Sequence, residues 1–313
     1  MLVFTTVAIV RLRSLFAIIM LSGIYSLLSA NIFVVLDAVD VAFTEAAVGA
    51  GISTVLMLAT LGITGHEMKQ RSKKNRILPL LVVTITGAIL IYGTLDMPAF
   101  SDATAPIHQH VAPRYIIDSP IEIGIPNMVT SVLASYRGYD TMGEVIVVFA
   151  ALVGVLSLIG IREAKVPPNY AEIPARPILQ VMAKFMIPFI ILFALYVQFH
   201  GDFGPGGGFQ AGVIFSVAII LYTLTFSQYD GMRLAPPKVL KVLAAIGVLI
   251  YGGTGIWTLL AGGTFLNYSV LGETSVSGQH IGILIIEFGV GLTVATAMML
   301  LFFAFVSRGE NNP

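Results

Sequence analysis

The sequence predicts an all-α, polytopic integral membrane protein, and three observations support this fold class. Hydrophobic residues make up 57% of the 313 residues and charged residues only 11%, whereas soluble domains carry about 25% charged residues. Eight apolar stretches are each long enough for a helix to cross the hydrocarbon core, which takes about 20 residues. These stretches lack the alternation of strands and exceed the length of a barrel strand. The sequence therefore predicts that most of the protein surface faces lipid.

The eight predicted spanning helices follow one another with short polar breaks, except for one long break after the third. In order they are Leu15–Leu36, Val41–Thr64, Ile77–Leu95, Met142–Ile161, Pro177–Phe199, Phe209–Phe226, Val239–Leu260 and Ile281–Val306. The apolar segment Met1–Val10 precedes them and is short for a span. It could pass for part of a signal peptide, but no small-residue cleavage site followed by a soluble domain is found. We expect it to be retained, as a short or tilted helix.

The basic residues sort onto one side of the membrane if the predicted spans alternate in direction. That side holds Arg11, Arg13, Lys69, Arg71, Lys73, Lys74, Arg76, Arg162, Lys165, Arg176, Arg233, Lys238, Lys241 and Arg308. The other side holds only Arg114 and Arg137. Short cytoplasmic loops are enriched in Lys and Arg, so we expect a multi-pass protein of the cell (inner) membrane with these basic loops in the cytoplasm.

Three blocks divide the chain: residues 1–75, 76–165 and 166–313. The first ends in the basic linker, and the second contains two spans around a long outer loop, Met97–Asp140. Val166–Pro177 carries four prolines and is typical of a stiff linker. The third block contains four spans.

Composition also limits the classes of function. The formal net charge is 0, so nothing indicates a nucleic-acid partner. The chain has no cysteine, which excludes disulfides, iron–sulfur ligation and a Cys-based zinc site. His108 and His110 lie near each other without an evident third ligand, so no metal site and no cofactor are expected. No hydrolytic constellation of catalytic residues stands out, and we expect a non-enzyme.

Ionisable residues inside spans are costly and are therefore candidate functional residues. The candidates within spans are Glu45, Glu144, Lys184 and Glu287, and those at span ends are Asp40, Asp140, His200 and Asp202.

Glu45 is the leading candidate for an ion path. At helical spacing it shares a face with Ala42, Gly49 and Ser53. Small residues on that face allow another helix to approach closely, so Glu45 is expected to point at protein rather than lipid. The alternative is a packing role, in which the carboxylate only hydrogen-bonds a neighbouring helix.

The other intramembrane candidates each have a structural alternative. Asp140 could cap a helix whose first turn contains Glu144, where the helix dipole favours negative charge. Glu287 lies on the same side as Gly291 and resembles Glu45 in its setting. Lys184 is the basic residue within a span, and it could snorkel to the inner surface, pair with a carboxylate or belong to a proton path.

A glycine-rich string, HGDFGPGGGFQAG, runs from His200 to Gly212. It lacks the Lys-Ser/Thr of a phosphate loop and the dinucleotide fingerprint. Its glycines permit a tight turn or close helix packing, so we interpret it as a structural hairpin between two spans. His200 could titrate near neutral pH or serve as a hydrogen-bonded anchor.

Three strings in the sequence resemble subunits of multisubunit Na+/H+ antiporters of the Mrp/Mnh family. Residues 37–62 resemble the MbhD-like segment at the C-terminal end of the large MrpA subunit, and residues 136–158 resemble the MbhE-like segment that follows it. Residues 200–222, 247–268 and 280–295 resemble the MnhB/MrpB subunit. The three blocks would thus be an MbhD-like segment, an MbhE-like segment and an MnhB/MrpB-like domain, joined here in one polypeptide.

The resemblance implies a transporter subunit of a hetero-oligomeric complex that exchanges Na+ for H+. Its partners would be antiporter-like large subunits and small Mrp-type subunits, and Glu45 and Glu144 would lie on the ion path. Two alternatives remain open. One is the membrane arm of a redox-driven ion pump such as membrane-bound hydrogenase, and the other is a purely structural scaffold.

Overall fold

The computed structural model describes residues 1–68, 77–162 and 177–309, and these residues form an all-α fold. Eight helical spans are long and apolar enough to cross a membrane, which confirms the predicted fold class. They are α2 (Leu15–Val35), a continuous helix made of α3 (Val39–Glu45), the π-helical turn η1 (Ala46–Ile52) and α4 (Ser53–Thr64), α5 (Ile77–Thr94), α9 (Gly138–Leu158), α10 (Pro177–His200), α11 (Gly208–Thr225), α13 (Pro237–Leu260) and α14 (Ser275–Gly309).

Several spans begin earlier than the apolar runs that predicted them. α9 begins at Gly138, not Met142, and α14 begins at Ser275, not Ile281. The first turns of both helices contain polar residues, and a search for apolar runs does not include them in the predicted span. The segment Met1–Val10 forms α1 (Leu2–Arg11), a helix of 10 residues. At 1.5 Å per residue it is about 15 Å long, half the thickness of a hydrocarbon core.

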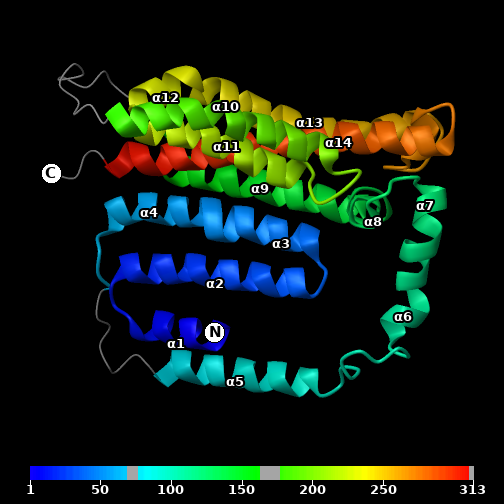
Figure 1. Cartoon of the computed structure of the whole chain (residues 1–313), viewed down its shortest axis with the longest axis horizontal. Helices are drawn as coiled ribbons and strands as arrows, with labels where there is room; N and C mark the ends of the chain where they lie inside the picture. Colours follow the sequence, from blue (N-terminus) through cyan, green and yellow to red (C-terminus); the bar gives the residue numbers. More distant parts are fainter. Residues whose placement is uncertain (69–76, 163–176, 310–313) are drawn as a thin grey trace.

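α14 is the central helix of the main bundle. It packs against α9, α11, α13 and α4 (Figure 1), and 72% of its most apolar stretch is buried. Small residues allow this close packing: a Cβ atom on Gly247 of α13 would lie 2.6 Å from the carbonyl oxygen of Gly289 in α14. The core of the protein therefore lies along α14.

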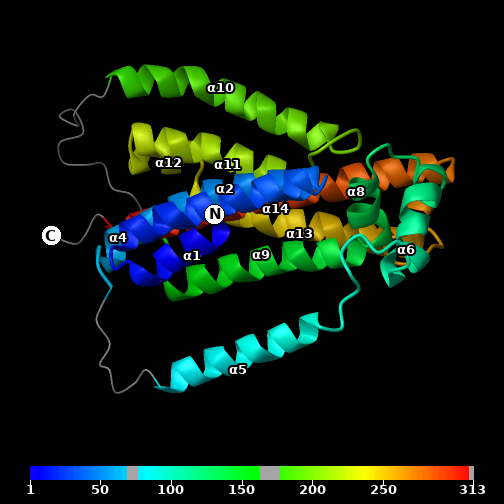
Figure 2. The same ribbon diagram turned by 60° about the horizontal axis from the view of Figure 1, so that its bottom comes forward.

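The N-terminal helices form a layer beside this bundle. In Figure 1, α1, α2 and the α3–α4 helix lie side by side, and α4 contacts α14. α5 stands apart from the bundle in Figures 1 and 2, and every residue of it except Gly87 is exposed. By itself, the chain thus leaves a complete hydrophobic helix exposed along its length.

The bundle has two distinct ends. The glycine-rich turn, Gly201–Gly207, lies at the end that we name the turn end, and the opposite end, where α4, α9 and α14 finish, is the linker end (Figure 1). Short elements cover the turn end: α6 (Pro106–His110), η3 (Arg114–Asp118), α7 (Ser119–Glu122), α8 (Met128–Thr130), η4 (Ser131–Tyr136) and η6 (Tyr268–Leu271). The predicted outer loop thus contains ordered helical turns that are too short to be read from hydropathy.

The helix ends that carry the predicted cytoplasmic basic residues lie together at the linker end, next to α12 (Gln228–Leu234). Part of that basic set lies outside the described residues: Lys69, Arg71, Lys73, Lys74, Arg76, Lys165 and Arg176.

Candidate functional site

A cavity of about 350 Å³ lies towards the turn end, where α3, α9, α11 and α14 meet. It brings together three of the predicted carboxylates, Asp40 of α3, Glu144 of α9 and Glu287 of α14. The polar part of its lining is completed by Thr44, Thr130, Thr141, Gln210 and the backbone of Gly206, Gly207 and Gly208. Apolar side chains, among them Leu133, Phe209 and Val290, form the rest of the wall. Residues far apart in the sequence therefore build one chamber with carboxylate, hydroxyl and amide groups in a partly apolar wall, which we name the acidic cavity.

Glu287 is the most enclosed carboxylate of this cavity. Its exposed fraction is 8%, and its Oε2 atom has no hydrogen-bond partner among the described residues. The glycine-rich turn lies against it, since a Cβ atom on Gly207 would be 3.2 Å from Oε1 and one on Gly201 3.4 Å from the same atom. Gly207 also has a φ of +122°, which favours glycine. The turn is thus built around the Glu287 carboxylate.

Two hydrogen bonds join α3 to the turn and to the start of α11. The backbone N–H of Gly206 donates to Asp40 Oδ1 at 3.1 Å, and Gln210 Nε2 donates to Thr44 Oγ1 at 2.8 Å. Asp40 and Thr44 are four residues apart, so both face the same side of α3. This side of α3 forms one wall of the cavity.

The segment before α9 holds the turn in place. Asn127 Nδ2 donates to the carbonyl oxygens of Gly201 and Gly204 at 3.0 and 2.9 Å, and Thr130 Oγ1 donates to Gly201 at 2.6 Å. The backbone N–H of Asn127 also donates to the carbonyl oxygen of Asp202 at 3.0 Å. Because these bonds satisfy backbone groups in a turn with few side chains of its own, Asn127 and Thr130 fix its shape.

The expected roles of Asp140 and Glu144 at a helix N-terminus differ from the arrangement found. α9 begins at Gly138, so Glu144 lies in its second turn, where the influence of the helix dipole is weaker. Asp140 does not cap the helix; it is exposed and pairs with Arg137 at 2.7 Å. Of these two carboxylates, Glu144 is the one that lines the cavity.

Glu45 lies on a different face of its helix from the cavity wall. Its Oε1 atom would be 2.6 Å from a Cβ atom on Gly49, and Ser26 of α2 lies as close to the same position. The expected close neighbour is therefore α2, and Gly49 lies on the same face as Glu45. The π-helical turn η1 begins at the next residue; such turns are frequent at functional sites. Glu45 is not among the residues that line the acidic cavity.

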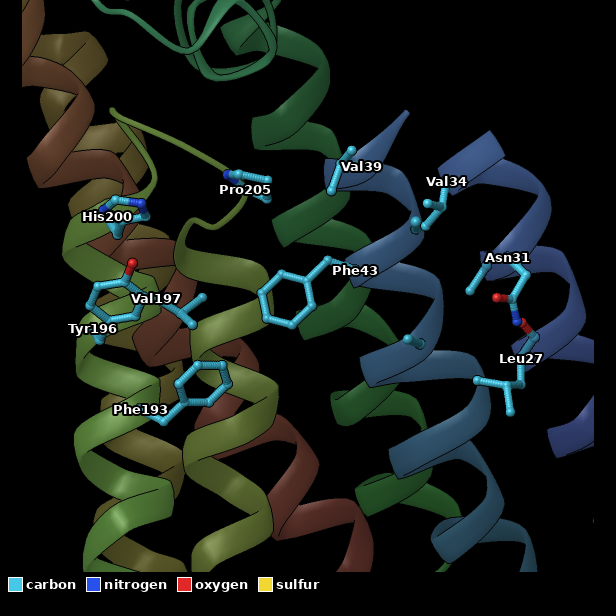
Figure 3. A pocket seen from close by; sticks show the side chains of 13 residues that line it. Leu27, Asn31, Val34, Val39, Phe43, Phe193, Tyr196, Val197, His200 and Pro205 are labelled. Atoms are coloured by element: carbon cyan, nitrogen blue, oxygen red, sulfur yellow. The ribbon is translucent and has the colours of Figure 1, made fainter. Parts of the chain in front are cut away.

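His200 and Lys184 also lie outside the acidic cavity. His200 stacks on Tyr196, with ring centroids 4.7 Å apart, and borders a largely apolar cavity of about 520 Å³ between α2, α3 and α10. Figure 3 shows the side chains that line this cavity; Phe43 of α3 and Phe193 of α10 come from facing helices and meet edge to face, with ring centroids 6.5 Å apart. Lys184 is exposed, and its Nζ atom lies 5.4 Å from the centre of the Phe226 ring near the linker end.

Two further titratable residues lie close to the acidic cavity: Asp202, which the sequence already offers as a candidate, and His280, which no sequence pattern singles out. Asp202 lies at the end of one predicted span, and His280 lies just outside the predicted last span. In the structure Asp202 is 4% exposed and its Oδ2 atom lies 3.2 Å from His280 Nδ1. Burial raises the pKa of Asp202, and the charge and hydrogen bond of His280 lower it in part. Only the fold brings this pair together, since 78 residues separate them.

Comparison with known proteins gives three consecutive family matches. The model described as "Domain related to MnhB subunit of Na+/H+ antiporter" matches residues 178–300. The MbhD and MbhE models, which describe two subunits of MBH, match residues 1–65 and 80–175. The resemblance drawn from the three sequence strings is thereby confirmed.

Two curated relatives cover different parts of the chain. The probable K(+)/H(+) antiporter A/B subunit of Rhizobium meliloti (strain 1021) is 24% identical over 345 aligned positions, which span 97% of this chain and 33% of the relative. The putative antiporter subunit mnhB2 of Staphylococcus haemolyticus (strain JCSC1435) is 32% identical over 131 positions, which span 39% of this chain and 92% of the relative. The chain thus spans about a third of the length of the first relative and most of the second.

Two solved structures are similar to the fold. A chain of the Mrp complex from Dietzia sp. DQ12-45-1b matches with a TM-score of 0.78 and 26% identity, over 97% of this chain and 34% of that one. A chain of the membrane-bound sulfane sulfur reductase, an archaeal respiratory membrane complex, matches with a TM-score of 0.56 and 28% identity, over 74% of this chain and 97% of that one. On the combined family matches and the near-complete coverage of the mnhB2 relative, the chain belongs to the family of MnhB-related antiporter subunits, with its MnhB region preceded by regions related to MbhD and MbhE.

Proposed function

We propose that this chain is a subunit of a multisubunit monovalent cation (Na+)/proton antiporter of the cell membrane, and that the acidic cavity is part of its ion path. In this role the chain belongs to a transporter and is not an enzyme. Its relatives are named as antiporter subunits, and one similar structure is that of an Mrp complex. The linker end, with its basic residues, faces the cytoplasm under this proposal.

The observation that carries the proposal is the environment of Glu287. A carboxylate within a membrane span is costly, so such residues are rare, and they usually pair with another group or mark an ion or proton path. Here Oε2 of Glu287 is buried without a partner among the described residues, in a chamber that it shares with Asp40 and Glu144. Such a group of carboxylates can bind and release a proton, or hold a weakly bound monovalent cation with the hydroxyl and amide oxygens around it.

The shape of the chain fits a place within a larger complex. Glu144 lines the cavity yet is exposed in the isolated chain, so a further protein is needed to close the chamber on that side. α5 is exposed along its length. We propose that antiporter-like large subunits and small Mrp-type subunits supply these missing contacts and the remainder of the route.

The second candidate function is the membrane arm of a redox-driven ion pump. The similarity to a chain of the sulfane sulfur reductase complex, which covers 97% of that chain, favours it. Identification of the subunits that co-purify with this chain separates the two: antiporter-like subunits alone support exchange, and subunits that carry redox centres support a pump.

The test of the ion path is Glu287→Gln in the assembled complex. Glutamine keeps the volume of the side chain but cannot exchange a proton, so we expect normal assembly and loss of cation/proton exchange in membrane vesicles. Glu273→Gln is the matched control, because Glu273 is exposed at the same end and lies outside the cavity lining; its complex should exchange at the normal rate. Normal exchange by an assembled Glu287→Gln complex would instead favour a scaffold role.

A further inference from the structure

The acidic cavity has a neighbouring pair of titratable residues that reaches from the molecular surface towards Glu287. The His280 side chain is 33% exposed, whereas that of Asp202, which it contacts, is 5% exposed. His280 Nδ1 lies 3.2 Å from Asp202 Oδ2. Asp202 Oδ1 is buried and has no hydrogen-bond partner in the described part of the chain. The pair thus has one end at the surface and a free carboxylate oxygen inside.

His280 and Glu287 lie on one face of α14. They are seven residues apart, which is close to two helical turns and about 10 Å along the axis. Asp202 lies on the adjoining turn, and a Cβ atom on the residue before it, Gly201, would be 3.4 Å from Glu287 Oε1. The backbone that carries Asp202 therefore rests against Glu287, and both carboxylates have one buried oxygen without a partner among the described residues.

Three carboxylates, Glu287, Asp40 and Glu144, lie near this pair in the described part of the chain, as do the side chains of Tyr251, which interacts with Glu287, and of His200, which borders the same turn. Asp202 faces His280 and Glu287 of α14, and Asp40 of α3 acts on Glu287 from the other wall of the cavity. Glu144 of α9 lines the same cavity. A proton that reaches Asp202 therefore stands next to a group of proton acceptors.

We propose that His280 and Asp202 form the proton access point of the acidic cavity at the turn end. The proposal rests on the function proposed above. A hydronium ion at the surface protonates His280 on Nε2, and the proton on Nδ1 passes to Asp202 Oδ2, which leaves a neutral ring with its proton on Nε2. Release of the Nε2 proton to surface water and uptake of a proton on Nδ1, or a flip of the ring, restores the starting tautomer before the next transfer. Asp202 then gives a proton through cavity water to Glu287 and regains its charge. Each step moves one proton, and the cycle can run in either direction.

A purely structural role is the competing explanation, in which the pair only fastens the glycine-rich turn to α14. Two substitutions distinguish the explanations because they keep the hydrogen bond and remove the titration. In His280→Asn the amide nitrogen occupies the position of Nδ1 and still donates to Asp202. In Asp202→Asn the side-chain amide can still form a hydrogen bond with the imidazole of His280. Neither amide can accept and release a proton in the physiological range, whereas histidine changes charge between about pH 5 and 8.

The experiment uses the complex with all its subunits, reconstituted into liposomes, with the pH on the turn-end side varied and the pH on the linker-end side fixed. We expect both variants to assemble normally and to lose the dependence of exchange on turn-end pH. The maximal rate should fall by about tenfold, less than the roughly hundredfold effect of losing a positioned proton-transfer group, because other steps share control of the rate. The half-saturating cation concentration should not change. His110→Gln is the control, since His110 is exposed at the same end.

The outcomes separate the two proposals. Glu287→Gln could abolish exchange while assembled His280→Asn and Asp202→Asn complexes keep the normal rate and pH profile. In that case the proposed proton access point is wrong, and the proposal that the acidic cavity is part of the ion path is retained. If Glu287→Gln exchanges normally, the proposed function itself fails. Should either pair variant assemble poorly, diethyl pyrocarbonate modification of the native complex provides a second measurement. The loss of exchange should follow the fraction of modified His280 measured by peptide mass, and full exchange with His280 modified would overturn the proposal.

Discussion

Gly208, the first residue of α11, lies directly against the backbone carbonyl of Glu287 in α14. A Cβ atom on Gly208 would lie 2.1 Å from that oxygen, closer than any side chain can approach. This backbone contact between α11 and α14 thereby fixes the position, along the axis of α14, at which the Glu287 side chain meets the glycine-rich turn. The geometry of the acidic cavity depends on this backbone contact as much as on the carboxylates themselves.

Gly208→Ala should therefore destabilise the complex, since an added methyl group must push α11 away from α14. Overpacking of this kind typically costs about 1–3 kcal/mol. A lower melting temperature and a smaller yield of assembled complex would show it. Gly253→Ala in α13 is the matched control, because nothing among the described residues lies within 4 Å of its Cβ position. Equal melting temperatures for the two variants would contradict the proposed contact.

Glu45→Gln tests whether a second carboxylate, outside the cavity, also takes part in transport. A carboxylate at the centre of a span costs about 2.5–3.5 kcal/mol on the scale measured for aspartate, and less towards the ends. Hydrogen bonding to α2 needs only an amide, whereas ion transfer needs the carboxylate. We expect an assembled complex with strongly reduced exchange, and partial exchange in Glu45→Asp. Near-normal exchange by the glutamine variant would leave Glu45 with a packing role.

The burial of Asp202 predicts a dependence of stability on pH. Burial raises its pKa above the value of 3.8 for an exposed aspartate, so the folded state binds the proton more tightly than the unfolded state. This contribution is fully present below the unfolded pKa and is lost as the pH rises through the folded pKa. The melting temperature of the native complex should thus fall relative to that of Asp202→Asn as the pH rises from about 4. A rise in the melting temperature of the native complex relative to that of Asp202→Asn over the same pH range would contradict the prediction.

Side-specific labelling tests the orientation. Single cysteines at Ser72, in the basic linker outside the described residues, and at Ala103, an exposed residue beyond α5, should react with an impermeant reagent from opposite sides of the membrane. Ser72→Cys should label from the cytoplasm. Labelling of both from one side would contradict a crossing by α5.

Hydropathy predicts all eight spans because each helix that crosses lipid needs a long apolar run. It does not predict how the helices are rotated. The sequence favours Glu45 as the central carboxylate, yet Thr44, its neighbour, faces the acidic cavity and Glu45 faces α2. Rotation depends on which neighbours a helix finds, and a single apolar run holds no information about its neighbours.

The three carboxylates of the acidic cavity could be anticipated from residue type alone, whereas the residues that support the glycine-rich turn beside it could not. Asp40, Glu144 and Glu287 are candidates because charge inside a span is costly. Asn127, Thr130 and His280 lie in the segment between α5 and α9 and at the polar start of α14, where polar residues are ordinary. Their positions against the glycine-rich turn follow from tertiary contacts over 70 residues or more in sequence.

The central position of α14 has a consequence for biosynthesis. The helix around which α4, α9, α11 and α13 pack follows all of them in the sequence. When α13 has just been made, Glu287 and the rest of α14 have not yet been inserted, so the helices that pack against α14 still lack their common neighbour. The bundle around α14 can therefore close only after this helix is inserted, and a nascent chain stopped before Ser275 would lack the core of the bundle.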